Sequence, residues 1–292
     1  MTLIERVRYV VTANNAPAET TPTWQAGANY LPDDKRVFGD RIYVCAKANK
    51  GEKNPTQTVD EWVDMGAINP KRFEDEYVNT QTRSATALNL TLNIPGGFVN
   101  SFAFFNTDGK KITILDRNDA VIFEKELTVR DVVINWWQYF FGGSFSYRND
   151  VWSVGDVDYG GQIKIEIEPN EKGANLGHLV IGKKVFLGKT LWEPEVSNLD
   201  YSKKITDDWG NTKMRKGKTA KYVSAKIVLP SSQVDFVSKA LQKASGELNL
   251  FIGDEREDGY ECLSVFGAAK DASITIMNSQ TSELNLNIEG VI

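Results

Sequence analysis

The sequence predicts a mainly β, multi-domain protein. Short runs of β-branched and aromatic residues are separated by Gly, Asn and Asp turns, and aromatic residues make up 11% of the chain. A chain of 292 residues is long enough to bury a sizeable core and to hold about two domains. We therefore expect an N-terminal strand and linker (1–22), a small β unit (23–68), a connector (69–90), a β-sandwich or jelly-roll-like domain (91–188) and an α+β domain (189–292).

The N-terminal segment MTLIERVRYVVT has the alternation of a strand. Its apolar residues Leu3, Val7, Tyr9 and Val11 recur at every second position or multiples of it, which predicts one buried face. The segment 13–23 that follows is rich in Pro, Thr and Asn, a composition typical of a linker.

The small unit that follows contains the pattern VFGDRIYV, which predicts two short strands around a Gly-Asp turn. A unit of roughly 45 residues is too small for a large core of its own. We expect it to be held together by a cluster of core aromatic residues: Trp24, Tyr30, Tyr43 and Trp62.

The middle region repeats strand-like runs separated by polar turns. The runs are LNLTLNI, GFVNSFAFFN, KKITILD and AVIFEKELTV, and the turns between them are PGG, TDGK and DRND. The later run QIKIEIEP alternates with a period of two, as a half-buried strand does. This spacing is typical of a sandwich or jelly roll.

The densest aromatic cluster, INWWQYFFGG, lies within this middle region. It contains Trp136, Trp137, Tyr139 and Phe141, and alternation makes both of its faces largely apolar. We expect a core edge or a subunit interface, because Trp and Tyr make large contact energies at interfaces. An exposed platform for a sugar ring is the alternative.

The last hundred residues predict an α+β domain with one clear helix, at about 231–244. Ser231 is a candidate cap, Val234, Val237 and Leu241 have helical spacing, and Gly246 follows the end. Strand-like runs surround the helix, and a long polar hairpin is expected at 200–222. Its basic stretch KMRKGKTAK is interpreted as a solvated hairpin tip, with a polyanion-binding patch as the alternative.

The residues that carry catalytic and metal chemistry are sparse. The single histidine, His178, has no nearby partner in the sequence for a triad or a metal site, and no nucleotide, zinc or hydrolase motif is present. The acidic pairs in GDVDYGG, TDDWG and GDEREDG lie beside Gly, where turn formation explains them better than catalysis or calcium binding. We expect no enzyme activity, no catalytic residue, no metal and no cofactor.

Charge, cysteines and hydropathy limit the partners. A net charge of −5 gives no attraction for nucleic acid or anionic membranes, and no apolar run is long enough for membrane insertion. Cys45 and Cys262 are far apart in strand-like runs and are expected to be buried free thiols of a protein folded in a reducing cytoplasm. The N-terminus, MTLIERVRYVV, does not have the pattern of a signal peptide.

Residues 24–66 resemble the small chitinase-type carbohydrate-binding module. The resemblance is carried in order by Trp24, Tyr30, Val37, Gly39, Tyr43, Pro55 and Trp62. These are mostly core positions of that family. The sugar-stacking aromatics expected after the Ala-Lys of such modules are replaced here by Asn49, Lys50 and Gly51. The resemblance therefore implies the fold of the module without its sugar site.

Most of the chain resembles a family of structural virion proteins of tailed bacteriophages, encoded among tail and fibre components. The most specific stretch is LDYSKKITDDWGNT, and its matching residues are Asp200, Tyr201, Ser202, Lys203, Lys204, Asp207, Trp209, Gly210 and Asn211. The resemblance implies a non-enzymatic tail, baseplate or fibre-attachment adaptor that forms homo-oligomers in the virion. Its expected partners are other copies of itself and other tail or fibre proteins. A glycan-binding adhesin that contacts host surface polysaccharide is the alternative, and a polysaccharide hydrolase is the third hypothesis.

Overall fold

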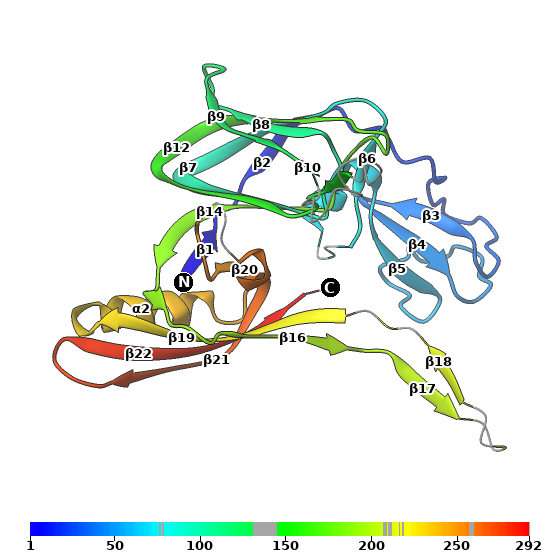
Figure 1. The fold of residues 1–292 in the computed structure, drawn as a ribbon. Coiled ribbons are helices and arrows are strands. Elements are labelled where there is room, and N and C mark those ends of the chain that lie inside the picture. The colour runs from blue at the N-terminus through cyan, green and yellow to red at the C-terminus, as the bar shows by residue number, and fades with distance from the viewer. Residues whose placement is uncertain are drawn as a thin grey trace, which may run out of the picture.

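The computed structural model (Figure 1) describes residues 1–75, 77, 79–130, 145–206, 209, 212–215, 217, 219–256 and 260–291. The prediction of a mainly β chain is confirmed, because strands are the main regular structure of the described chain. Within it the structure has one α-helix, α2 (Val234–Ala244), and three short 3-10 helices, η1 (Asn69–Glu74), η2 (Ser231–Gln233) and η3 (Glu261–Leu263).

One antiparallel sheet of thirteen strands runs through both halves of the molecule. Its order is β15 (Lys189–Thr190), β19 (Thr219–Pro230), β22 (Thr281–Gly290), β21 (Ser264–Ile276), β20 (Asn249–Ile252), β1 (Thr2–Arg6), β14 (His178–Phe186), β7 (Leu88–Phe105), β12 (Val151–Glu168), β8 (Lys111–Leu115) and β9 (Val121–Glu126). Two further strands join it from the side, β16 (Glu195–Asp200) on β19 and β2 (Val10–Asn14) on β7.

Four small sheets complete the β structure. Three are two-stranded: β6 (Thr82–Ser84) with β13 (Ala174–Leu176), β10 (Thr128–Arg130) with β11 (Phe145–Tyr147), and β17 (Lys203–Thr206) with β18 (Thr212–Arg215). The fourth has three strands, β3 (Lys35–Phe38), β4 (Arg41–Cys45) and β5 (Trp62–Ala67), and we call the segment 23–68 that contains them the small β unit. As expected, β3 and β4 are joined by a tight turn, with Gly39 at φ +61°.

The upper half of the molecule is built on the two longest strands, β7 and β12, which bend over each other. The PGG segment was expected to end a strand, and this is wrong: β7 continues through it. Gly96 takes φ +66°, and the pairing of β12 with β7 shifts register between Val154 and Tyr159 and again after Gly160. Bulges and glycines bend a strand without ending it. The bent strands β7 and β12 enclose a large apolar core, which includes Leu90, Phe102 and Ile165.

The first strand joins the two halves. β1 pairs with β14 on one side and with β20 on the other. The expectation of one buried face is wrong here, since the adjacent residues Leu3 and Ile4 are both fully buried. A central strand covered on both faces has this pattern. The strand also ends at Arg6, and β2 begins a separate pairing with β7 at Val10.

The lower half consists of β19, β22 and β21 with α2 packed on one face (Figure 1). The predicted helix is confirmed: Val237 and Leu241 are buried in the core beneath it, and Val234 packs at its edge. The predicted Ser231 cap is wrong, because the helix begins without a side-chain cap. The Ser231 hydroxyl instead donates to the carbonyl of Asn278 at 2.8 Å, which ties the helix start to the β21–β22 turn.

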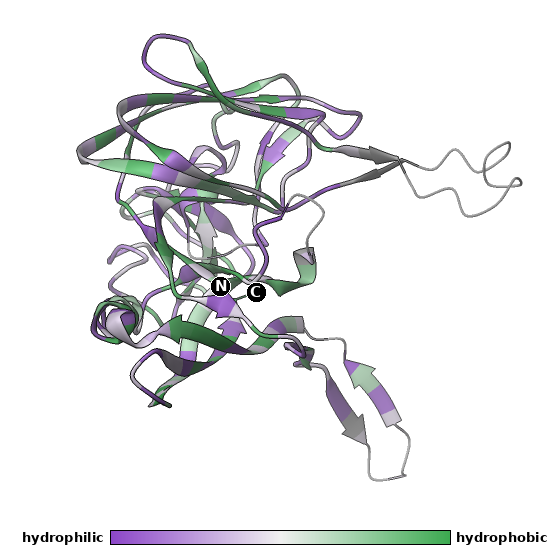
Figure 2. Cartoon of the chain, turned by 60° about the vertical axis from the view of Figure 1, so that its left-hand side comes forward, coloured by the Kyte–Doolittle hydropathy of each residue, from purple (hydrophilic) through white to green (hydrophobic). Residues whose placement is uncertain are grey.

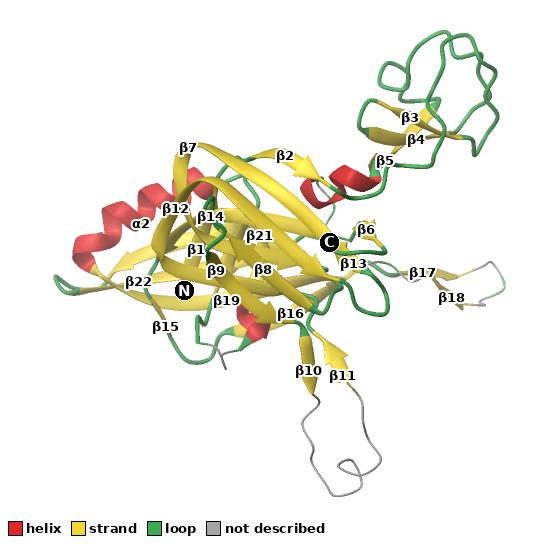
Figure 3. Ribbon diagram, turned by 90° about the horizontal axis from the view of Figure 1, so that it is seen from above, coloured by secondary structure: helices red, strands yellow, loops and turns green. Residues whose placement is uncertain are grey.

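Three parts extend from this body in separate directions (Figure 3). They are the small β unit around β3–β5, the β10–β11 pair, and the β17–β18 hairpin beyond β16 and β19. The expected aromatic anchors Trp136, Trp137, Tyr139 and Phe141 lie outside the described residues.

Candidate assembly surface

The core aromatics of the small unit occupy structural positions. The rings of Tyr30 and Trp62 meet edge to face at 5.1 Å, and both side chains are buried. The Tyr30 hydroxyl accepts from the Gln25 amide at 2.7 Å and donates to the Gln25 carbonyl at 2.8 Å. Tyr43 is buried in the same cluster, and Trp24 packs at its edge. These rings therefore hold the unit together.

The loop after Ala46 is organised by Asn49. Its side-chain amide donates to the Lys47 carbonyl at 3.1 Å, and its side-chain oxygen accepts from the Gly51 amide at 3.1 Å. Five aromatic side chains lie in 23–68, a range that the structure describes throughout: Tyr30, Tyr43 and Trp62 are buried, and Trp24 and Phe38 pack against each other edge to face at 5.5 Å. A sugar ring stacks on an aromatic face only where that face is open to solvent. This unit therefore presents no aromatic platform.

The β17–β18 hairpin is the second projection, and we call residues 201–218 the arm. It continues outward from β16 and β19, which pair from Glu195↔Ser224 to Asp200↔Thr219. At the point where it leaves the sheet, the Gly217 amide donates to the Ser202 hydroxyl at 2.9 Å. A Cβ at Gly217 would collide with the backbone of Tyr201. The two backbone segments, at Tyr201 and at Gly217, therefore cross at a distance that only glycine allows.

The arm strands have little protein around them. All four residues of β18, and Lys203, Lys204 and Thr206 of β17, are exposed. Figure 2 shows the arm extending away from the body, with hydrophilic and hydrophobic residues along β18. A two-stranded hairpin is marginally stable by itself in water. Its stable conformation is therefore expected to depend on a surface that covers it.

Large exposed apolar side chains are concentrated on the arm and on the segment 191–200 that leads into it. Of the twenty exposed large apolar side chains in the described residues, seven fall within 191–214. They are Leu191, Trp192, Val196, Leu199, Tyr201, Trp209 and Met214. Trp209 is 89% exposed, Trp192 83% and Met214 63%. Such a concentration marks an interaction surface more often than scattered single residues do.

The arm is also basic. Its sequence contains six Lys or Arg and two Asp, a formal charge of +4, whereas the whole chain carries −5. The remainder of the chain therefore carries −9. The expectation that residues 213–221 form a solvated hairpin tip is wrong: the stretch begins in β18 and ends in β19 of the main sheet, where Ala220 is buried. The exposed apolar side chains of the arm are a feature that polarity alone did not indicate.

The residues that resemble the virion family have different roles at the arm. Asp200 accepts from the Ser202 amide at 2.8 Å, and hydrogen bonds from Ser202 lower the pKa of its carboxyl. The Tyr201 hydroxyl donates to Glu289 on β22 at 3.1 Å, which fixes the base of the arm to the sheet. Asp207 and Gly210 lie outside the described residues.

His178 is a buried core residue at the start of β14. Its ring lies 4.9 Å from the Phe266 ring, and the Arg6 guanidinium lies over the same phenyl ring at 5.7 Å. Burial and, to a lesser extent, the positive charge of Arg6 lower the pKa of His178 to about 4, against an opposing hydrogen bond with the Asp75 backbone. The imidazole is thus neutral near pH 7.

Two of the three acidic stretches have structural partners among the described residues, and Asp207 and Asp208 lie outside those residues. Asp156 and Asp158 lie in the bulged part of β12 rather than in a turn, which corrects the expectation, and they contact Lys184 at 3.3 Å and the Asn100 amide at 3.0 Å. Asp254 holds Arg256 at 2.6 Å, and this contact lowers the pKa of Asp254 to about 2.

The cysteines are free. Cys45 is buried as expected, whereas Cys262 is exposed and lies in η3 rather than in a strand. The expectation for Cys262 is therefore wrong.

Metal-ligating side chains do not cluster in the part of the chain that the structure describes: no group of three or more His, Cys, Asp or Glu there could hold a metal ion. Within the same residues, no helix is long and apolar enough to cross a membrane.

Comparison with known proteins identifies no family for this chain. No family model matches the sequence, and no curated protein matches it. A solved structure described as "His 62 mutant of the lectin binding domain of Lectinolysin complexed with Lewis b" matches 41% of this chain and 85% of that chain, with 10% sequence identity and a TM-score of 0.25. At this level the match identifies neither a shared fold nor a shared function.

Proposed function

We propose that the protein is a structural, non-enzymatic adaptor of a tailed-bacteriophage virion, in the tail, baseplate or fibre-attachment region. It assembles with copies of itself and anchors neighbouring tail or receptor-binding components. The observation that supports the proposal most is the arm, a projecting hairpin with exposed strands and large exposed apolar side chains. The resemblance of residues 199–212 to virion proteins is the reason for placing the proposed adaptor in a virion.

The physical reason is the composition of the arm. Trp and Tyr contribute strongly to interface energies once they are desolvated, and Trp209 and Tyr201 present large surfaces to solvent in the single chain. Burying them against a neighbour would remove apolar area from water and order a hairpin that has no core of its own.

Charge favours another copy of the same chain as the neighbour. An arm of formal charge +4 and a remainder of −9 attract each other between copies. A contact between two different surfaces of identical subunits closes into a ring when the rotation allows it. Contacts from the arm of each copy to the body of the next would therefore build a symmetric ring around a tail.

A glycan-binding adhesin remains the alternative function, but the small β unit gives it no support. Three of its five aromatic rings are buried, the other two, Trp24 and Phe38, pack against each other, and its loop is built on Asn49. In the proposed function this unit is a structural projection that offers a surface to other subunits.

Mass spectrometry of purified phage particles tests the virion setting. We expect this chain among the proteins that remain with particles after density-gradient purification, and cross-links from Lys203 or Lys213 to a second copy. Lys239, exposed on α2, is the reference lysine for non-specific cross-linking. Absence of the chain from particles whose other tail proteins are detected would reject the virion proposal.

A further inference from the structure

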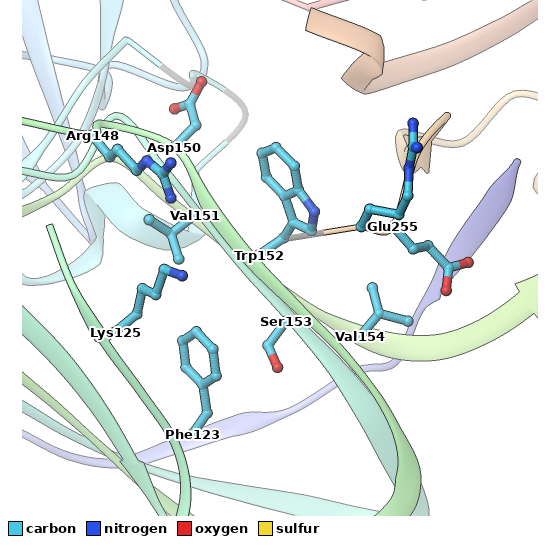
Figure 4. A pocket seen from close by; sticks show the side chains of 10 residues that line it. Phe123, Lys125, Arg148, Asp150, Val151, Trp152, Ser153, Val154 and Glu255 are labelled. Carbon is cyan, nitrogen blue, oxygen red and sulfur yellow. The ribbon is translucent and has the colours of Figure 1, made fainter. Parts of the chain in front are cut away.

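A cleft lies between the two halves of the molecule, at the start of β12. It has a volume of about 240 Å³ and is lined by Phe123 and Lys125 of β9, Trp152 and Ser153 of β12, and Glu255 and Arg256 of the loop after β20. Figure 4 shows Trp152 between Arg148 and Asp150 on one side and Glu255 on the other. The cleft is thus an aromatic site with polar walls that come from three separate segments.

A second hollow adjoins the first and shares Trp152 and Asp150 with it. It has a volume of about 250 Å³, and Phe105, Lys221 and Cys262 contribute to its walls. Trp152 is half-buried and packs at the edge of the apolar cluster that joins the two halves. Each hollow is smaller than the roughly 300–1,000 Å³ typical of drug-sized pockets, so each fits a single small ring.

The charged groups of the cleft already have partners. Glu255 pairs with Lys184 at 3.2 Å and accepts from the Thr2 hydroxyl, and Arg256 is held by Asp254 at 2.6 Å. Asp150 accepts from the Asn106 amide at 2.9 Å.

The two remaining cationic side chains, Lys125 and Arg148, are engaged as well. The lining carries three cationic and two acidic side chains, each with an interaction inside the chain, so no large surplus of one charge is left to select an ion. Its fixed carboxylates, ammonium groups and hydroxyls can still exchange hydrogen bonds with a neutral ligand rich in hydroxyl groups.

From this geometry we propose that the cleft around Trp152 binds a neutral saccharide, with one sugar ring against the indole. The C–H face of the ring stacks on Trp152, and the polar walls on both sides receive its hydroxyls. This activity is additional to assembly through the arm, and it uses neither the small β unit nor any residue of the arm.

Saturation-transfer difference NMR on the full chain tests the site. The probes are the methyl glycosides of glucose, galactose, mannose and N-acetylglucosamine, each at millimolar concentration, with methyl glucuronide as a charged comparison. We expect saturation of ring C–H protons in at least one neutral glycoside, and a loss of affinity of about tenfold or more in Trp152→Ala.

Two further variants separate binding from folding. Ser153→Tyr fills the cleft without removing Trp152 and should also abolish the signal, whereas Trp192→Ala removes an exposed Trp elsewhere and should leave it unchanged. The proposal is overturned by an absence of signal from every neutral glycoside. A signal that persists in both cleft variants, or tighter binding of the glucuronide, would also overturn it.

Discussion

The Gly217 amide donates a hydrogen bond of 2.9 Å to the Ser202 hydroxyl at the point where the arm leaves the main sheet. On one side of this contact, β16 and β19 belong to the thirteen-stranded sheet. On the other side, β17 and β18 pair only with each other within the described residues. The contact therefore sets the direction in which the arm projects.

Substituting Gly217 tests this contact. Gly217→Ala places a Cβ against the backbone of Tyr201, so these two backbone segments must separate and the arm must change direction. We expect faster limited proteolysis by trypsin at Lys203, Lys204, Lys213 and Arg215, with an unchanged melting temperature of the body. Ser202→Ala is the matched variant, since it removes the acceptor without a collision and should cost only about 1 kcal/mol. Equal protection of the arm in Gly217→Ala and wild type would show that the close approach is not needed.

His178 predicts a pH dependence of stability. Its pKa is about 4 in the folded chain and 6.5 for the ordinary side chain, so the unfolded state binds a proton more readily between these values. Stability is therefore full above pH 6.5 and falls as the pH decreases toward 4. The loss from this residue amounts to about 3 kcal/mol over the interval.

Urea unfolding of wild type and His178→Phe at several pH values measures this loss. The variant keeps a ring beside Phe266 and removes the titrating group. We expect its free energy of unfolding to decrease less than that of wild type as the pH falls from 6.5 to about 4. Parallel curves for the two proteins would contradict the assignment.

In the loop of the small β unit, substitutions of the adjacent residues Asn49 and Lys50 should have different effects on stability. Asn49→Ala removes the bonds to Lys47 and Gly51 and should cost the unit about 1–2 kcal/mol, seen as faster amide hydrogen exchange there. Lys50→Ala, at an exposed position, should change stability by less than about 0.5 kcal/mol. Neither change should alter any affinity for sugar. A sugar affinity that falls in Lys50→Ala with an intact fold would restore this loop as a binding site.

The two thiols predict different reactivity. In the native protein, one thiol per chain should react quickly with Ellman's reagent, because Cys262 is exposed while burial protects Cys45 and raises the pKa of its thiol. The second thiol should react only after unfolding in urea. Cys262→Ser should remove the fast phase, and a fast phase that survives this change would mean that Cys45 is accessible.

Local sequence patterns were sufficient for the elements whose evidence is short-range. Val234, Val237 and Leu241 specify the buried face of α2, and the Gly39 turn between two β runs specifies the β3–β4 hairpin. In both cases the neighbours that decide the structure lie within a few residues.

The sequence could not indicate features that depend on distant partners. The burial of both Leu3 and Ile4 follows from the position of β1 between β14 and β20, which lie about 180 and 250 residues away along the chain. The cleft at Trp152 combines β9, β12 and the loop after β20 in the same way. The sequence shows that Trp209 and Met214 are apolar, but it does not show that their side chains are exposed. Apolar residues in a strand pattern indicate a core unless the topology shows that nothing covers them.

Sedimentation velocity over a wide concentration range tests the central claim of assembly through the arm most directly. We predict that wild type self-associates, that Trp209→Ala/Met214→Ala weakens association by about tenfold or more, and that Met277→Ala, an exposed site on another strand turn, has no effect. All three proteins should keep the same melting temperature at concentrations where they are monomeric. A wild-type chain that stays monomeric throughout, or a double variant that associates as wild type does, would contradict the account.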